Sequence, residues 1–152
     1  SQAIQFATGS KYSHCGLIFQ TDTGKREWYV LEAVQPVKWT PLASWIARGE
    51  GGHFVIKRPR VEPPPSGQDL QRVKTVGERF VGKDYDLYFG WSDERIYCSE
   101  LIWKAYHAAT GLEIGKHWLR KRKCYWQGKV VSWPVTRRRL LPLGKSNERS
   151  DP

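Results

Sequence analysis

Cys98 is the residue of this chain whose type and position best fit nucleophilic chemistry. It stands in the string Tyr97-Cys98-Ser99-Glu100-Leu101, at the predicted start of a helix. The N-terminal end of a helix carries a positive partial charge. That charge favours the thiolate, which is the reactive form of cysteine. Cys98 also belongs to the apolar stripe of this helix, so a purely structural cysteine is the alternative interpretation.

A nucleophilic cysteine needs a base, and His14 is the candidate at the start of a predicted strand. If Gln20 pairs with Arg26 across a hairpin, His14 lies opposite Glu32 on the same face, with Cβ atoms about 4.5–5.5 Å apart. Glu32 interrupts an otherwise apolar strand, and a buried carboxylate requires a partner. The pattern therefore indicates a Cys98–His14–Glu32 set, with ordinary polar strand residues as the alternative for His14 and Glu32.

The remaining cysteines and histidines give weaker signals. Cys15 and Cys124 have no helix start beside them and are predicted to be packing or surface thiols. A metal site is the other use for such side chains, but their spacing fits no standard ligand pattern. We therefore predict no cofactor and no metal. The side chains that a metal site would have to use are His14, Cys15, His53 and His117.

Six elements are expected to position these residues in an α+β domain with a mostly antiparallel sheet. The first two are strands within 14–20 and 27–33, which form a hairpin. Thr40-Pro41 opens a short helix, with Thr40 as its cap and Pro41 at its first position. A third strand is predicted at 53–58. Two longer helices follow, one capped by Ser66 and Asp69 that ends near Gly82, and one over 97–110 that ends at Gly111.

Residues 82–95 are predicted to be a loop, and 128–135 an edge strand because of Pro134. The aromatic side chains Tyr85 and Tyr97 are candidates to line a cleft beside Cys98, with simple packing as the alternative. We expect a single domain over 1–143 and a flexible polar tail over 144–152.

The composition excludes several classes of protein. The chain has 152 residues, with eight Trp, seven Tyr and five Phe, too many aromatic side chains for a disordered chain. No apolar run reaches the length of a membrane span. Three cysteines make no disulfide framework.

Lys and Arg number 25 against 15 Asp and Glu, which gives a formal net charge of +10. Such an excess suggests an anionic partner. A nucleic-acid-binding module without catalysis is one alternative, but no binding motif accompanies the basic runs. An anionic membrane or envelope polymer is favoured over nucleic acid. The basic side chains concerned are Lys116, Arg120, Lys121, Arg122, Lys123, Arg137, Arg138 and Arg139.

Five strings together resemble one known family, the YiiX-like, circularly permuted branch of the NlpC-type papain-like cysteine hydrolases. Each string is weak alone, but their order and spacing over roughly the first 110 residues are specific. They are Lys11-Tyr12-Ser13-His14-Cys15-Gly16-Leu17-Ile18, Val30-Leu31-Glu32-Ala33-Val34, Thr40-Pro41-Leu42 with Trp45-Ile46, Gly82-Lys83-Asp84-Tyr85-Asp86, and Tyr97-Cys98-Ser99-Glu100-Leu101.

The resemblance implies a permuted papain-like fold, in which the histidine strand precedes the cysteine helix. It assigns Cys98 as nucleophile, His14 as base and Glu32 as the residue that orients His14. The implied activity is hydrolysis of an amide or ester through an acyl-enzyme, on an envelope peptide or a lipid. Related permuted enzymes of the lecithin–retinol type make acyl transfer to another acceptor the alternative.

The resemblance also favours a bacterial periplasm or cell envelope over the cytoplasm. Family members place a Gly-Asp strand ahead of the position of Ser1, so we expect either a chain trimmed or processed there or a fold that lacks this strand.

Overall fold

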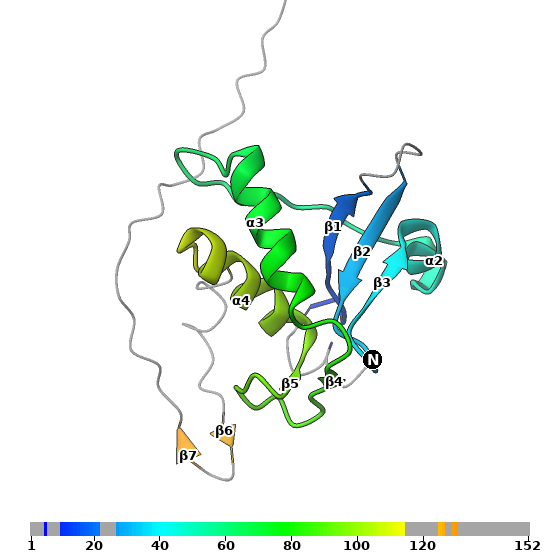
Figure 1. Cartoon of the computed structure of the whole chain (residues 1–152). Coiled ribbons are helices and arrows are strands. Elements are labelled where there is room, and N and C mark those ends of the chain that lie inside the picture. Colours follow the sequence, from blue (N-terminus) through cyan, green and yellow to red (C-terminus); the bar gives the residue numbers. More distant parts are fainter. Residues whose placement is uncertain (1–4, 6–9, 22–26, 115–124, 127–128, 131–152) are drawn as a thin grey trace, which may run out of the picture.

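The predicted hairpin forms the first two strands of a three-stranded antiparallel sheet in the order β1-β2-β3 (Figure 1). In the computed structural model the described residues are 5, 10–21, 27–114, 125–126 and 129–130. Strand β1 covers Leu17–Gln20, β2 covers Trp28–Glu32 and β3 covers Lys38–Pro41. His14 lies just ahead of β1, and Glu32 is the last residue of β2.

The register of the hairpin differs from the predicted one by two residues. Gln20 pairs with Trp28, not with Arg26, because the connection runs over 21–27 and is longer than the five-residue loop assumed. A slip of two residues keeps every side chain on its own face, so His14 and Glu32 still share a face, as diagonal neighbours. Gly16 takes the position opposite Glu32: a Cβ added there would lie 3.4 Å from the Glu32 Cβ.

Gly16 is required by this close pairing of strands. A Cβ at that position would meet the Val30 Cγ1 atom at 2.4 Å and the Leu31 carbonyl oxygen at 2.9 Å. Both distances are shorter than any tolerated carbon contact, so a side chain would force β1 away from β2. The glycine thus keeps the segment that carries His14 against the strand that carries Glu32.

The prediction that Thr40 caps a helix is wrong. Thr40 and Pro41 end strand β3, and helix α2 covers Leu42–Ala47 with Pro41 at its N-cap and no side-chain cap bond. A threonine before a helix commonly caps it, but the Thr40 hydroxyl donates its hydrogen bond to the Glu32 carboxylate instead. A short 3-10 turn, η1, follows at Glu50–Gly52.

The predicted strand at 53–58 is also wrong. The segment pairs with no strand in the described part of the chain, and Phe54, Val55 and Ile56 are 44%, 49% and 56% exposed. Apolar and β-branched residues favour a strand only where a neighbouring strand can pair with it. This segment instead leads from α2 to α3 (Figure 1).

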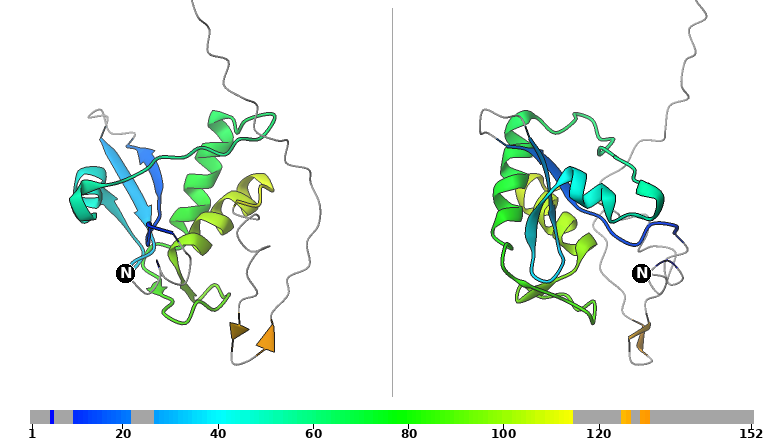
Figure 2. Two further views of the ribbon diagram at one scale, coloured as in Figure 1. Left: turned by 180° about the vertical axis from the view of Figure 1, so that it is seen from behind. Right: turned by 90° about the vertical axis from the view of Figure 1, so that its right-hand side faces the viewer.

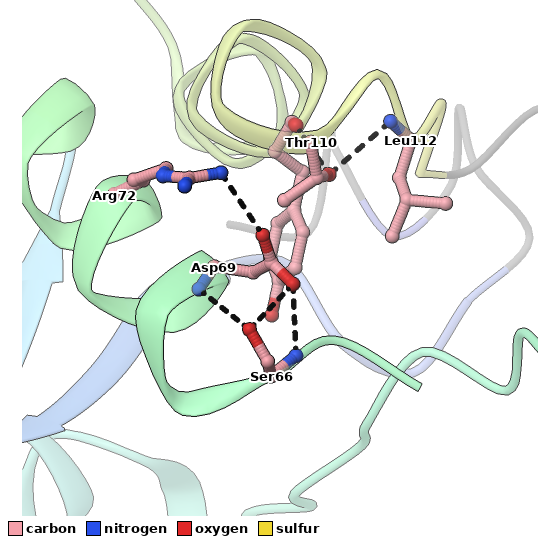
Figure 3. A network of polar contacts seen from close by, with 6 residues as sticks. Ser66, Asp69, Arg72, Thr110 and Leu112 are labelled. Carbon is pink, nitrogen blue, oxygen red and sulfur yellow. Dashed lines mark hydrogen bonds and ion pairs between the residues drawn. The ribbon is translucent and has the colours of Figure 1, made fainter. Parts of the chain in front are cut away.

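The two long helices are confirmed with their predicted caps, although the first ends at Glu78 and not near Gly82. Helix α3 covers Gly67–Glu78; the Ser66 Oγ accepts from the Asp69 N–H at 3.2 Å, and the Asp69 carboxylate accepts from the Ser66 N–H at 2.9 Å (Figure 3). Helix α4 covers Cys98–Thr110 and ends at Gly111, whose φ of 72° is left-handed. Both ends follow the preferences of helix termini.

The predicted loop over 82–95 contains two very short strands. Strand β4, Asp84–Tyr85, pairs in parallel with β5, Arg95–Ile96. Because β5 is followed directly by Tyr97 and Cys98, this pairing places Tyr85 beside the start of α4.

The core lies between the sheet and the pair of helices α3 and α4, while α2 lies beside β3 on the other side of the sheet (Figures 1 and 2). Gly77 lies where these layers are in close contact. A Cβ at Gly77 would lie 2.7 Å from the Leu31 Cδ2 of β2 and 3.9 Å from the Ala105 Cβ of α4. The buried apolar core consists of Leu17, Leu31, Ala33, Val37, Val73, Phe80, Ile96, Cys98, Leu101 and Ala105.

Several predictions fall outside the described residues. Of the strand expected over 128–135, the structure describes only β7, Lys129–Val130, paired with β6, Tyr125–Trp126. The basic runs and the tail at 144–152 lie outside, and the division into a domain over 1–143 and a tail stays a prediction. Among the described helices, none combines the length and the apolar character that crossing a bilayer would take.

We expect Gly77→Val to lower the free energy of unfolding by about 1–3 kcal/mol, because its branched side chain would push α3 away from Leu31. Gly67→Val in the same helix is the matched control, since nothing lies within 4 Å of a Cβ there; it should change stability by less than about 0.5 kcal/mol. Urea unfolding of both variants measures the difference. Equal stability of the two variants would contradict the close packing described.

Candidate active site

The structure brings Cys98 and His14 into contact from opposite ends of the described chain. Cys98 is the first residue of α4 and is 7% exposed, and His14 precedes β1 with 28% of its side chain exposed. The Cys98 sulfur and the His14 ring share a hydrogen bond. Because the first N–H groups of a helix have no partner within it, the sulfur also lies at a positive helix end.

Glu32 is the centre of the polar contacts around His14. Its carboxylate is fully buried, and its Oε2 lies 2.6 Å from the His14 Nε2. The Thr40 hydroxyl donates to Oε1 at 2.6 Å. The Arg48 Nη2 donates to Oε1 at 2.6 Å and to Oε2 at 2.5 Å. Three elements, namely the start of β1, strand β3 and the end of α2, thus supply partners for one carboxylate.

These contacts decide the charges of the site. Burial alone would raise the pKa of Glu32, but the bonds from His14, Thr40 and Arg48 lower it to about 2. Burial would lower the pKa of His14, yet its bonds to Cys98 and Glu32 raise it to about 9. An opposite charge at hydrogen-bond distance favours the charged form of each partner. Glu32 is therefore a carboxylate and His14 an imidazolium near neutral pH.

The Cys98 thiol is ionised in this setting. A hydrogen bond from the Cys15 thiol lowers its pKa most; burial opposes the shift, and the bond and charge of His14 lower the pKa further, to about 4. Cys98 and His14 consequently form a thiolate–imidazolium pair between about pH 4 and pH 9. This is the protonation state in which a cysteine attacks a carbonyl carbon.

Two further side chains contact the Cys98 sulfur. Cys15 donates its thiol hydrogen to the thiolate; this hydrogen bond, followed by burial and the charge of Cys98, raises the pKa of Cys15 far above its usual range. The prediction that Cys15 is a packing thiol is confirmed, since it packs against the core cluster, but its interaction with Cys98 was not predicted. The Tyr85 hydroxyl also lies within hydrogen-bond reach of Cys98, and burial raises its pKa, with the nearby thiolate adding to the shift.

Tyr85 is held in place by Gln35. The Gln35 Oε1 accepts from the Tyr85 N–H at 2.7 Å, while the Gln35 Nε2 donates to the Asp84 Oδ1 at 2.6 Å. Tyr97, the other aromatic candidate, is the N-cap residue of α4 and packs its ring edge-on against Phe89, with centroids 5.2 Å apart. Tyr85 thus reaches the sulfur, whereas the Tyr97 ring packs on Phe89.

The start of α4 is fixed by Glu100. Its buried carboxylate accepts from the Tyr97 N–H at 3.4 Å and pairs with the Lys104 Nζ at 2.9 Å. A carboxylate three residues into a helix commonly closes the N-terminal turn in this way. The backbone around Cys98 is thereby held while its own N–H stays at the helix end.

Three contacts of the site were not predicted, those of Thr40, Arg48 and Cys15. A strand assigned to 38–41 would have found Thr40, because Val30 pairs with Thr40 and Glu32 with Lys38, which puts Thr40 diagonal to Glu32. The apolar setting of Glu32 signalled a need for partners, but nothing in the residue types pointed to Arg48. Cys15 follows His14 directly, and that adjacency was the available signal.

The other histidines lie elsewhere. His53 is exposed, and His107 stacks on Trp103 with ring centroids 4.3 Å apart. His107 lines a cavity of about 520 Å³ that residues of α3 and α4 border. Cys98, His14 and Glu32 are not among the residues that line it. His117 and Cys124 lie outside the described residues.

Comparison with known proteins gives matches to a family, to a single relative and to a solved structure. The sequence profile of a family described as permuted papain-like amidase enzymes, YaeF/YiiX, C92 family, matches residues 1–141. The chain is also 46% identical over 116 residues to the protein YiiX of Escherichia coli (strain K12). That match covers 76% of this chain and 55% of YiiX, so the chain spans little more than half the length of this relative.

A solved structure matches as well. It is described as the crystal structure of metalloprotein yiiX from Escherichia coli O157:H7, and it superimposes with a TM-score of 0.69 at 46% sequence identity. The match covers 76% of this chain and 62% of the crystallised one.

We expect Cys98 to react with iodoacetamide at a nearly constant rate between about pH 5 and pH 8, since its pKa of about 4 leaves it ionised there. The rate should fall only as the pH drops through about 4. An ordinary thiol, with a pKa near 8.5, would instead gain about tenfold per pH unit over that range. Mass spectrometry of alkylated peptides measures the rate at Cys98.

His14→Ala should shift the Cys98 profile to higher pH, because it removes the neighbouring positive charge. His53→Ala is the matched control and should leave the profile unchanged, since His53 is exposed and takes part in none of the contacts described for Cys98, His14 and Glu32. A wild-type rate at Cys98 that climbs like that of an ordinary thiol would show that no thiolate–imidazolium pair exists.

Proposed function

Because the chain belongs to the C92 family of permuted papain-like amidase enzymes, we propose that it is a cysteine hydrolase of amide or ester bonds with Cys98 as nucleophile. The observation that carries the proposal is the contact of an ionised Cys98 with a protonated His14 that is itself anchored on buried Glu32. A nucleophile, a base and an orienting group in this arrangement are the requirements of acyl transfer.

The reaction starts with attack of the Cys98 thiolate on the carbonyl carbon, which forms a C–S bond and places negative charge on the carbonyl oxygen. The Cys98 N–H at the start of α4 donates to this oxygen. The Tyr85 hydroxyl, whose raised pKa keeps it protonated, is a second donor within reach of the sulfur. Collapse of the intermediate breaks the bond to the leaving nitrogen or oxygen, which takes a proton from His14.

The resulting thioester is cleaved by water. Neutral His14 accepts a proton from the water, whose oxygen attacks the thioester carbon and releases a carboxylic acid and the Cys98 thiolate. Glu32 holds the ring through Nε2 in both steps, and Thr40 and Arg48 keep Glu32 ionised. A different acceptor in place of water would give acyl transfer by the same residues.

We assign no residue of this chain to a metal. The word metalloprotein describes the Escherichia coli relative. In the part of this chain that the structure describes, His, Cys, Asp and Glu form no group of three or more that could hold a metal ion.

An acyl lipid is favoured over an envelope peptide as substrate by the loop that follows Tyr85. Four of its large apolar side chains are exposed, which is unusual so close together on a protein surface. Aromatic side chains of this kind suit the boundary between water and an acyl phase. They are Leu87 at 75%, Tyr88 at 64%, Phe89 at 52% and Trp91 at 42% exposure. An anionic envelope surface, with a periplasmic or envelope location, agrees with this substrate.

Rapid-quench mass spectrometry tests the hydrolase with p-nitrophenyl acetate as probe. We expect a burst of p-nitrophenol and an acetyl group trapped on Cys98, with loss of both in Cys98→Ser and His14→Ala. The decrease in kcat/KM should be at least about 10³-fold, as in other nucleophile–base pairs whose members act as a unit. His53→Ala should retain the wild-type value. Turnover without an acyl group on Cys98 would overturn the assignment.

The substrate class is tested by comparing p-nitrophenyl octanoate with the acetate. Leu87→Asp should raise KM for the octanoate by about fourfold to fifteenfold, the equivalent of one or two buried methylene groups, and leave the acetate unaffected. Val55→Asp, on another exposed apolar segment, is the matched control. Equal effects of the two variants would remove the support for an acyl lipid.

A further inference from the structure

Cys15 and Cys98 form a pair of free thiols in contact within the described part of the chain. Both are reduced in the structure, and Cys15 packs against the core cluster to which Cys98 belongs. Cys15 lies between His14 and Gly16, ahead of the first paired residue of β1, and Cys98 begins α4. The packing that places His14 beside Cys98 therefore also places its neighbour Cys15 there.

The two sulfurs differ in their chemistry. Cys98 is held as a thiolate by the hydrogen bond from Cys15, by His14 and by the helix end, and a thiolate is the form of cysteine that peroxides oxidise. Cys15 keeps its proton because of its hydrogen bond to Cys98, its burial and the negative charge of Cys98. The Cys98 sulfur is thus the one that peroxide oxidises, and the Cys15 sulfur remains a thiol beside it.

We propose that Cys15 and Cys98 form a reversible disulfide when hydrogen peroxide oxidises Cys98. First, the thiolate attacks an oxygen of the peroxide; an S–O bond forms, the O–O bond breaks, hydroxide leaves, and Cys98 becomes a sulfenic acid. Then the sulfur of Cys15 attacks the sulfur of Cys98; the S–S bond forms, the S–O bond breaks, and the hydroxyl leaves with the Cys15 proton as water.

The second step is assisted by the first. The interaction with the Cys98 thiolate is what most strongly holds the proton on Cys15. A sulfenic acid at Cys98 is neutral, so the interaction that keeps the proton on Cys15 is lost once the thiolate is oxidised. A sulfenic acid beside a second thiol condenses to a disulfide.

The disulfide would serve to protect the nucleophile. Formation of the bond removes the thiolate and stops hydrolysis, but it also prevents oxidation of Cys98 to the irreversible sulfinic acid. A dithiol reductant restores both thiols by exchange. The pair is in this way a modification site whose occupancy follows the balance of peroxide and dithiol.

The full chain is treated with hydrogen peroxide near neutral pH, digested without reduction and mapped by mass spectrometry. We expect the peptides of Cys15 and Cys98 to be joined, with the loss of two hydrogen atoms, and to separate on treatment with dithiothreitol. In Cys15→Ser and Cys15→Ala we expect no such link and a gain of two oxygen atoms on Cys98 that dithiothreitol does not remove. Cys124→Ser is the control and should retain the link.

Three results would overturn the proposal: a link from Cys98 to Cys124, a link between two chains, or unlinked sulfinic acid at Cys98 in the wild-type protein. The wild-type peptide map decides even if a Cys15 variant fails to fold. Because the readout is a mass and not a rate, the link can form in a protein that hydrolyses no ester. That outcome would leave the disulfide standing and overturn only the proposed hydrolase.

Discussion

The buried carboxylate of Glu32 is the constraint on which the rest of the site depends. An isolated charge in an apolar strand is strongly unfavourable unless it is paired and hydrogen-bonded. Glu32 meets that condition only because β1, β3 and α2 each bring a partner to it: His14, Thr40 and Arg48. Glycine at position 16 then allows the first of these segments to lie against β2 without a clash with Val30. The sheet and its flanking helix are thus arranged around one side chain.

The charges of the site alternate along a line of contacts. Arg48 is positive, Glu32 negative, His14 positive and Cys98 negative, so that neighbouring groups in the series carry opposite charges. Opposite charges at this distance stabilise one another, more so where water is excluded. The low pKa of Cys98 and the high pKa of His14 are therefore properties of the series, not of either residue alone. Replacement of Arg48 would therefore change the pKa of Cys98 through Glu32 and His14.

Sequence reasoning found the residues with strong local signals. Cys98 stood at a helix start, and Glu32 was the one charge in an apolar strand; alternation along the hairpin put Glu32 and His14 on one face even though the register was wrong by two residues. The permuted papain-like fold is confirmed by the family match and the solved relative. Arg48 was missed because its role depends on how α2 docks beside β2, which no local pattern encodes. Residues 53–58 were assigned to a strand because β-propensity does not reveal whether an edge is available to pair with.

The contact of Cys98 with His14 joins the start of β1 to the start of α4, and the packing between these elements determines its length. Helix α3 approaches β2 at Gly77, where a Cβ would meet Leu31, and α4 packs on α3 through Ala105. The small residues at this junction set how far the start of α4 stands from the sheet, and so the distance from the sulfur to the ring. A site held between two regular elements keeps its geometry more tightly than one held on loops. The same rigidity keeps the Cys15 thiol against the nucleophile, so the closeness that activates Cys98 also gives it a partner for oxidation.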